Sequence, residues 1–204
     1  ASAMGLITPQ SEMSPDEYKG WLKESRAVYS KHVSELEGII LTPQRDIDKP
    51  YNVVGVGHYL NGSTRSRSVV RQALPDVDYD ALASGSISLT KEQALELFKY
   101  DIRDYEIKAR KLSPKFETYS LNLRKHIVSA CYRGSWGGSP LTRGLLEEGK
   151  FEEAAKEFLD NDEYREAKKP NSGKRGVAIR MEAVADALRN EEKNKLKEQG
   201  DSNQ

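Results

Sequence analysis

The chain has 204 residues, 37% of them hydrophobic, which is enough for one or two compact units with a buried core. Its 32 Lys and Arg residues balance 32 Asp and Glu residues, so net charge gives no reason to expect nucleic acid or an anionic membrane as the main partner. The single cysteine, Cys131, excludes an internal disulfide and a cysteine-rich metal site, and no apolar run approaches the roughly 20 residues that span a bilayer.

The first predicted elements are helical. Ser14 followed by Pro15 is typical of a helix N-terminus, and aromatic and aliphatic residues then alternate with charged ones up to Gly38. We therefore expect one or two helices over residues 14–38. Residues 1–10 lack the basic region and apolar core of a secretion signal, so we expect any export to use another route.

The next segment has the pattern of short strands. Pro43, Pro50 and a cluster of β-branched residues favour strands joined by turns over residues 39–60, which predicts a small sheet or hairpin. Residues 61–88 mix turn residues with one short helical stretch, and we expect them to form a surface excursion.

The clearest helix covers residues 91–111. Four apolar residues fall at i, i+4, i+8 and i+11 on one of its faces, namely Ala94, Phe98, Ile102 and Tyr105. Thr90 is a helix-capping residue type, and Gln93 stands three positions later, which completes the pattern of a capping box.

The rest of the chain is predicted to be helical. Beyond residue 112, helical patterns alternate with Gly and Pro breaks, which indicates a helical C-terminal unit. Residues 191–204 are charged and polar, and we expect a fraying helix or a tail there. The predicted fold class is therefore α+β.

Two glycines and a histidine follow the β-branched run: Gly55, Gly57 and His58. A dinucleotide fingerprint requires a third glycine three residues after the second, but Leu60 stands there and a turn follows instead of a helix. The Gly-Lys-Ser/Thr of a phosphate-binding loop is also absent. The glycines either end a strand or let its backbone approach another ligand.

Carboxylates surround this stretch in the sequence. Glu35 and Glu37 end the helical pattern upstream, and Asp46 and Asp48 lie between them and the glycines. Glycoside hydrolysis needs one carboxylic acid that protonates the leaving oxygen and a second carboxylate that activates water or stabilises the cationic sugar ring. The alternative is a solvated charged surface, because 31% of the residues are charged.

The order of these motifs resembles that of the bacteriophage T4-type lysozymes, glycoside hydrolase family 24. Glu37-Gly38 is similar to the end of the family's first helix, and Asp46 follows nine residues after Glu37. Residues 53–58, VVGVGH, are similar to the family's strand that ends in Gly-x-Gly-His.

Segments further along the chain extend the resemblance. Residues 89–101 resemble the family's long inter-lobe helix, from Thr90 to Asp101. FEEAAKEF, residues 151–158, and GVAIRMEA, residues 176–183, are similar to helices of its second lobe. The resemblance implies a two-lobed lysozyme-like α+β fold. A helical extension at 1–30 would precede a lysozyme domain at 31–190, and a charged tail at 191–204 would follow it. Within the domain, an N-terminal lobe with a short antiparallel sheet would occupy 31–90, an inter-lobe helix 91–111 and a helical lobe 112–190.

The resemblance also implies an activity. A T4-type lysozyme is a muramidase that cuts the β-1,4 bond between N-acetylmuramic acid and N-acetylglucosamine in peptidoglycan. Glu37 would be the general acid and Asp46 the carboxylate that activates water, in an inverting reaction that leaves room for that water between the two carboxyl groups. No cofactor and no metal are implied.

His58 acquires a structural role from the resemblance. In the family, the histidine after Gly-x-Gly pairs with an aspartate of the inter-lobe helix, which here is Asp101, and such a carboxylate would raise the pKa of the histidine. The alternative is an exposed histidine near a turn. A metal site is not favoured, because His32 and His126 have no ligand spacing with His58.

One position departs from the family pattern. The family usually has threonine four residues before the second glycine, where it helps to hold the attacking water, and this chain has Val53 there. Counting forward from Asp46 reaches Asn52 instead, which indicates a one-residue insertion and makes Asp48 a competitor of Asp46. Either Asn52 substitutes for the threonine, the water is held otherwise, or activity is reduced.

The resemblance implies further substrate contacts, and for each the alternative is an ordinary helix-end or core residue. The candidates are Gly57, Tyr59, Cys131, Tyr132, Thr142 and Glu157.

The expected function is that of a phage endolysin acting on peptidoglycan glycan strands. It would reside in the host cytoplasm before release and act on the cell wall in the periplasm. The alternatives are a virion tail-associated or bacteriocin lysozyme domain, and a weakened lysozyme-like protein that binds peptidoglycan without cleaving it. A monomer is expected unless the chain docks to a virion assembly.

Overall fold

The computed structural model describes residues 7–201, so residues 1–6 of the predicted extension and 202–204 of the predicted tail lie outside the described residues. Residues 22–105 form one compact unit, and the described residues on either side of that segment form the other. Two long helices, α2 (Pro15–Glu37) and α5 (Lys91–Leu112), each contribute residues to both units. The boundary predicted at residues 30 and 31 falls inside α2, which runs through it unbroken.

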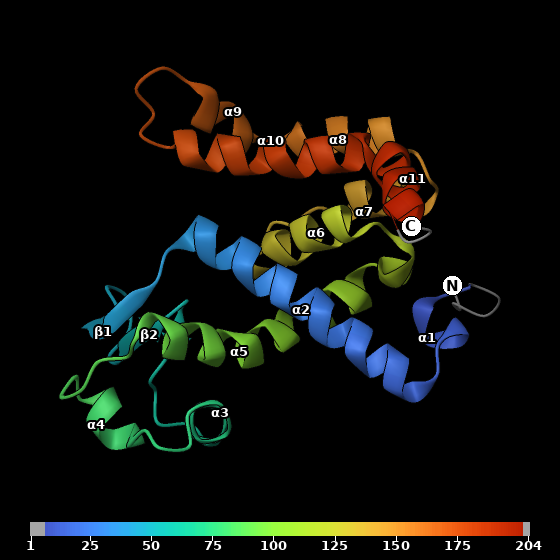
Figure 1. Ribbon diagram of the computed structural model, residues 1–204. Helices are drawn as coiled ribbons and strands as arrows, with labels where there is room; N and C mark the ends of the chain where they lie inside the picture. Colours follow the sequence, from blue (N-terminus) through green and yellow to red (C-terminus); the bar gives the residue numbers. More distant parts are fainter. Residues whose placement is uncertain (1–6, 202–204) are drawn as a thin grey trace. The chain divides into compact units, whose positions relative to one another are not determined.

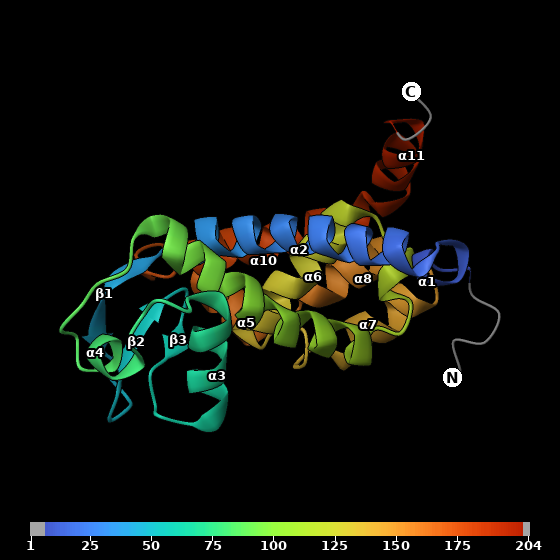
Figure 2. The same cartoon turned by 60° about the horizontal axis from the view of Figure 1, so that its bottom comes forward.

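The unit of residues 22–105 contains a three-stranded antiparallel sheet in the order β1-β2-β3, at residues Ile40–Arg45, Asn52–Gly55 and His58–Tyr59. Figure 1 labels the first two strands and Figure 2 labels all three. The small sheet expected over residues 39–60 is therefore present. Val53 and Val54 of β2 pair with Tyr59 and His58 of β3. An irregularity in β1 between Ile40 and Gln44 interrupts its register with β2.

The Gly-x-Gly sequence forms the turn between β2 and β3. Gly55 and Gly57 have φ angles of 65° and 73°, a left-handed conformation that residues with a Cβ atom rarely adopt. The turn reverses the chain within three residues and brings His58 opposite Val54. Both glycines are thus required by the hairpin itself.

The expectation that residues 61–88 form a surface excursion is wrong. They contain two helices, α3 (Thr64–Ala73) and α4 (Tyr79–Ala83), both labelled in Figure 2. The side chains of Ser63 and Asp78 cap them. These helices supply part of the unit's core, which also includes residues of the sheet and of α5. The buried residues of this core are Val54, Leu60, Val70, Leu74, Leu82, Leu89, Ala94 and Leu97. Turn-forming residues are also helix-capping residues, and this obscured the two short helices in the sequence.

Both predicted helix starts carry reciprocal caps. At α5, the Gln93 amide donates to Thr90 Oγ1 at 3.1 Å, and the Thr90 amide donates to Gln93 Oε1 at 2.9 Å. At α2, Ser14 and Glu17 exchange the equivalent bonds at 3.2 and 3.3 Å. These bonds satisfy amide groups that the first helical turn leaves without a partner, which confirms the capping box at Thr90 and the helix start at Ser14.

The other unit is helical throughout its regular structure. Its elements in chain order are α1 (Pro9–Glu12), the start of α2, the end of α5, the 3₁₀ helix η1 (Phe116–Thr118), α6 (Leu121–Arg133), α7 (Pro140–Glu147), α8 (Phe151–Leu159), α9 (Asp162–Lys168), α10 (Arg175–Arg189) and α11 (Glu191–Asp201). Helix α10 packs along α8 and also contacts α6 and α9. Trp136 and Phe158 are fully buried in this unit, and the Trp136 indole nitrogen donates to Ser113 Oγ at 3.0 Å.

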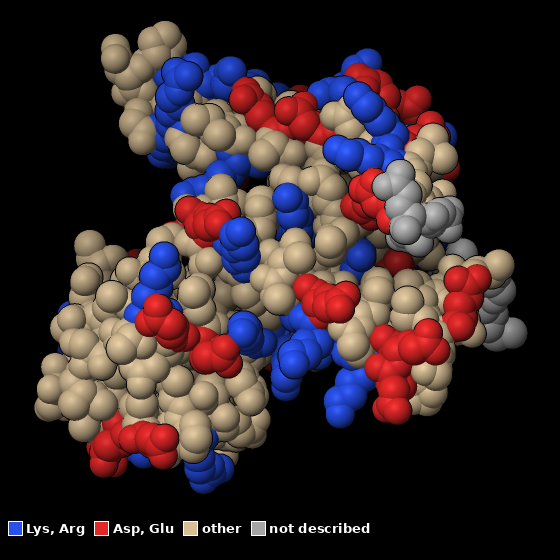
Figure 3. All heavy atoms as spheres, in the orientation of Figure 1, with Lys and Arg blue, Asp and Glu red and all other residues tan. Residues whose placement is uncertain are grey.

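Charges of both signs are interspersed over the face of the molecule seen in Figure 3, in agreement with the balanced composition. None of the helices within residues 7–201 is both long and apolar enough to cross a membrane.

Residues 191–201 of the predicted charged tail form helix α11, which caps another helix. The Glu191 carboxylate accepts the Ser120 amide at 3.0 and 3.2 Å, and Glu198 accepts the amides of Leu121 and Asn122 at 2.8 and 3.2 Å. The first amides of α6 thereby gain anionic partners at the positive end of the helix dipole. Glu191 is buried, and this burial raises the pKa of its carboxyl group despite the bonds from Ser120.

We expect this carboxyl group to make stability depend on pH. Because the folded-state pKa is raised, Glu191 contributes stability that is present below its usual pKa of 4.5 and is lost as the pH rises through the raised value. Glu191→Gln keeps an oxygen acceptor for Ser120 but does not ionise, so its stability relative to the parent should increase from pH 4.5 towards neutrality. Urea denaturation at several pH values measures this difference. Glu192→Gln, at an exposed neighbouring position, is the control and should show no such trend.

Candidate functional site

The two candidate catalytic carboxylates lie at the two ends of one short segment. Glu37 is the last residue of α2 and is half-buried, and it takes part in an interaction within the described residues. Strand β1 begins at Ile40, and Asp46 is the first residue after that strand. Both carboxylates therefore belong to the unit of residues 22–105.

The two candidate aspartates in the loop after β1 differ in burial and in hydrogen bonding. Asp46 is half-buried, its amide donates to the Tyr51 carbonyl at 3.2 Å, and its Oδ1 accepts the Asp48 amide at 2.9 Å. Asp48 is exposed. The carboxylate of Asp46 is thus oriented by the backbone of its own loop, while Asp48 supplies the amide that orients it.

The two candidate water-positioning residues start strand β2. Asn52 is half-buried, and its amide nitrogen donates to the Ala83 carbonyl at 3.0 Å, which ties the strand to the end of α4. Val53 is half-buried and lies opposite Tyr59 in the sheet. Its side chain offers no hydrogen-bonding group.

His58 is the centre of a buried hydrogen-bond network. Its Nδ1 lies 2.7 Å from Asp101 Oδ2, and because a carboxylate can only accept, the imidazole donates this bond. Its Nε2 lies 2.9 Å from Ser66 Oγ. His58, Ser66 and Asp101 are all buried. The contact with Asp101 is the one that the resemblance implied for His58.

Ser66 completes the network on α3. Its hydroxyl donates to the Tyr59 carbonyl at 2.8 Å and also lies 2.8 Å from the Tyr79 hydroxyl, which accepts the Gly62 amide at 3.0 Å. Since the single Ser66 proton goes to Tyr59, all these bonds are satisfied together when the imidazole and Tyr79 both donate to Ser66 Oγ.

The order carboxylate, imidazole, hydroxyl is also that of a serine nucleophile triad, but this network does not suit that chemistry. A triad histidine accepts the serine proton, whereas the Ser66 proton is directed to a backbone carbonyl. Ser66 is also only 4% exposed. The network therefore anchors the hairpin, α3 and α5 to one another.

The surface beside this network is a small polar pocket of about 170 Å³. Gly57 and Tyr59 line it from the hairpin, and both are exposed. Arg65 lines it from α3 and contacts both Asp101 and Asp104 of α5. The two predicted contact residues of the hairpin thus lie at an accessible surface with charges of both signs.

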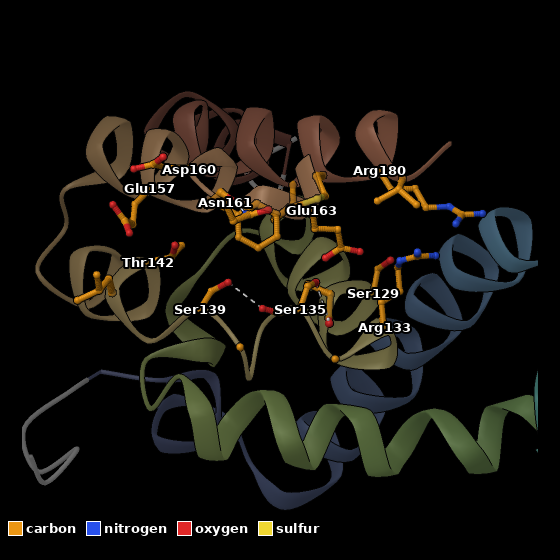
Figure 4. A pocket seen from close by; sticks show the side chains of 18 of the residues that line it. Ser129, Arg133, Ser135, Ser139, Thr142, Glu157, Asp160, Asn161, Glu163 and Arg180 are labelled. Atoms are coloured by element: carbon orange, nitrogen blue, oxygen red, sulfur yellow. Dashed lines mark hydrogen bonds between the residues drawn. The ribbon is translucent and has the colours of Figure 1, made fainter. Parts of the chain in front are cut away.

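The other unit contains a larger pocket of about 500 Å³ that brings together two further predicted residues, Thr142 and Glu157 (Figure 4). Thr142 lies on α7 and is buried, and Glu157 lies on α8 and is half-buried. The turn after α6 lines the pocket, as do the α8–α9 connection and one face of α10. This pocket lies entirely within its own unit.

The lining of this pocket is rich in polar groups. The charged residues Glu157, Asp160, Glu163, Arg133 and Arg180 are among those that line it. Asp160 pairs with Arg165 at 2.6 Å, whereas the carboxylates of Glu157 and Glu163 form no ion pair or hydrogen bond within residues 7–201. Such a lining suits a polar ligand that presents hydroxyl, amide or charged groups.

The expected substrate contact of Cys131 is not supported by its position. Cys131 is only 1% exposed, and burial raises the pKa of its thiol to about 12, so it is a packed core residue. Tyr132, the next residue on α6, is half-buried and does not line the 500 Å³ pocket.

Sequence reasoning missed several residues of both regions. Arg65, Ser66 and Tyr79 were missed because residues 61–88 were expected to form no part of the core. Ser63 and Ser66 follow the spacing of a helix cap, and this was the available signal. In the other unit, Asp160, Glu163 and Arg180 had no distinguishing pattern.

Within residues 7–201, no group of three or more His, Cys, Asp or Glu side chains is placed to hold a metal ion. No model of a known protein family matches the chain, and no curated protein sequence matches it at a significant level. The function is therefore argued from the residues themselves.

The buried contact between His58 and Asp101 generates a stability prediction. Asp101→Ala removes the partner of His58 and leaves buried donors without acceptors, so we expect a loss of about 3 kcal/mol in the free energy of unfolding. Asp104→Ala, one helical turn further on, removes a side chain that is 54% exposed and pairs with Arg65, and should cost less than about 1 kcal/mol. Urea denaturation compares the two. Equal losses would contradict the anchoring role of Asp101.

Proposed function

We propose that the chain is a muramidase that hydrolyses the β-1,4 bond between N-acetylmuramic acid and N-acetylglucosamine in peptidoglycan. One observation carries this proposal: the hairpin that follows Glu37 and Asp46 is joined through His58 to Asp101 at 2.7 Å. This contact is the one that the resemblance to T4-type lysozymes implies for these positions. The contact supports the alignment of this chain with the family pattern, and that alignment gives Glu37 and Asp46 their proposed roles. It also supports a lysozyme-like arrangement of the chain.

The proposed chemistry needs two carboxyl groups in different protonation states. Glu37, in its acid form, protonates the glycosidic oxygen as the bond to the sugar C1 breaks. Asp46, as a carboxylate, takes a proton from a water that attacks C1 from the opposite face, which inverts the configuration. Water is the only co-reactant, and the products are two shorter glycan strands.

The loop geometry favours Asp46 over Asp48 as the base. A general base must be held in one orientation relative to the attacking water, and Asp46 Oδ1 is held by the Asp48 amide at 2.9 Å. One carboxylate oxygen accepts this bond, so the other remains the candidate for the water. Asp48 is exposed, and its own carboxylate has no such support among the described residues.

Asn52 is the proposed substitute for the threonine of the family pattern. Its amide nitrogen is occupied by Ala83, which fixes the side chain and leaves its Oδ1 as an acceptor for a water. Val53 cannot take this role, and for that reason a protein that binds peptidoglycan without cleaving it is the second candidate function. The exposed Gly57 and Tyr59 are proposed substrate contacts on the hairpin.

The 500 Å³ pocket of the other unit is proposed to bind a second part of the substrate. Peptidoglycan strands carry sugar hydroxyls, amides and charged peptide groups, and the lining by Thr142, Glu157 and neighbouring charged residues complements them. The proposed biological role is that of a phage endolysin, held in the host cytoplasm before release and acting on the wall in the periplasm. A virion-associated or bacteriocin lysozyme domain would use the same chemistry.

Replacing the proposed acid tests the activity directly. Glu37→Gln removes the proton donor while keeping the side-chain shape, so lysis of purified peptidoglycan, followed by turbidity, should slow by about 10²-fold or more. Glu35→Gln, at an exposed position on the same helical turn, should lyse at the parental rate. Parental activity of Glu37→Gln would overturn the proposal.

The same lysis assay distinguishes Asp46 from Asp48 as the base. Asp46→Asn should slow lysis by about 10²-fold, because a carboxamide cannot take the proton of the attacking water. Asp48→Asn should retain most activity, because its backbone amide still holds Asp46. The reverse result would assign the base to Asp48. Full activity of both variants would exclude either aspartate as the base.

A further inference from the structure

A groove on the unit of residues 22–105 has no role in the proposed chemistry. It lies between the C-terminal half of α2, the start of β1 and the first turns of α5, elements that can be followed in Figure 1, and it encloses about 690 Å³. Its apolar lining is supplied by Ala27, Ile39, Leu41 and Leu95. Leu41 is 39% exposed, which is unusual for a leucine with a place in the sheet.

The rim of this groove is basic. Lys31, Lys91 and Lys99 line it, against a single carboxylate, that of Glu35. Lys99 is paired with Glu96 at 2.6 Å, whereas the ammonium groups of Lys31 and Lys91 make no ion pair within residues 7–201. The groove therefore combines an apolar lining with two positive charges that are available to a ligand.

A buried hydroxyl group also lines the groove. Ser30 is only 3% exposed, and its Oγ makes no hydrogen bond within the described residues. Buried hydroxyl groups are nearly always hydrogen-bonded, because leaving one without a partner costs about 1–3 kcal/mol. A ligand oxygen in the groove would supply the missing partner.

We propose that this groove binds a single-chain amphiphile with an anionic head, such as a fatty acid. The alkyl chain lies against Ile39, Leu41 and Leu95, and the head group lies between Lys31 and Lys91 with an oxygen bonded to Ser30 Oγ. The volume is within the range of small-molecule sites, about 300–1,000 Å³. The proposal goes beyond the muramidase chemistry and does not depend on it.

An acidic amphipathic helix of a protein partner is the competing occupant, and the groove suits it less well. The backbone groups within a helix are already hydrogen-bonded to one another, so they leave the Ser30 hydroxyl without a partner. A carboxylate head has acceptor oxygens for this hydroxyl and a charge for the two lysines at the same time.

Calorimetric titration of the full chain with dodecanoate, below its micelle concentration, tests the proposal. We expect a single site, and no binding of dodecyltrimethylammonium, which has the same tail and the opposite charge. The double variant Lys31→Glu/Lys91→Glu should weaken dodecanoate binding by about tenfold or more, because it reverses the charge that the head group meets. Lys23→Glu, an exposed position of α2 outside the groove, is the matched control and should bind as the parent does.

Two variants at Ser30 separate binding from folding. Ser30→Ala removes a buried group that lacks a partner, so Tm should not fall, while dodecanoate binding weakens several-fold. Ser30→Leu places a larger side chain into the groove and should abolish binding, with the circular dichroism spectrum confirming that the chain is folded. Equal binding of both amphiphiles, equal weakening by Lys23→Glu, or binding of an acidic helical peptide without dodecanoate binding would each overturn the proposal.

Discussion

The buried contact between His58 and Asp101 fixes how three elements of the unit of residues 22–105 are joined around its apolar core. It joins the turn of the hairpin to the long helix α5, and through Ser66 it also joins α3 to both. A polar network at this depth is stable only when every donor and acceptor is paired, and this one is paired throughout if the imidazole donates from both nitrogens. The position of the hairpin relative to α5 is thus specified by directional bonds as well as by apolar packing.

The structural role of the two glycines is to make this contact possible. Gly55 and Gly57 allow the chain to reverse within three residues, and only that reversal brings His58 opposite Val54, where its side chain can reach Asp101. Strand β2 also pairs with β1, and this second pairing places Asn52 opposite Arg45, next to the loop that carries Asp46. A Gly-x-Gly sequence that could suggest a phosphate cradle therefore serves a tight hairpin whose partner strand leads to the candidate base.

Local signals in the sequence were sufficient for some elements and insufficient for others. The start of α5 could be predicted because Thr90 and Gln93 carry their own capping geometry, which depends on neighbouring residues alone. The contact of helix α11 with α6 could not, because Glu191 and Glu198 become caps only when the chain folds back onto α6, about 70 residues distant in the sequence. The pairing of His58 with Asp101 is also non-local, and it was expected from the resemblance to a family rather than from spacing.

The division of the chain into two units separates the proposed chemistry from part of the proposed binding. Glu37 and Asp46 lie in one unit, whereas Thr142 and Glu157 line a pocket of the other. Groups that touch only remote parts of a substrate lower the free energy of its ground state and transition state alike, whereas the two carboxyl groups act on the bond that breaks. For a muramidase built in this way, changes around Thr142 would act mainly on KM, and changes at Glu37 mainly on kcat.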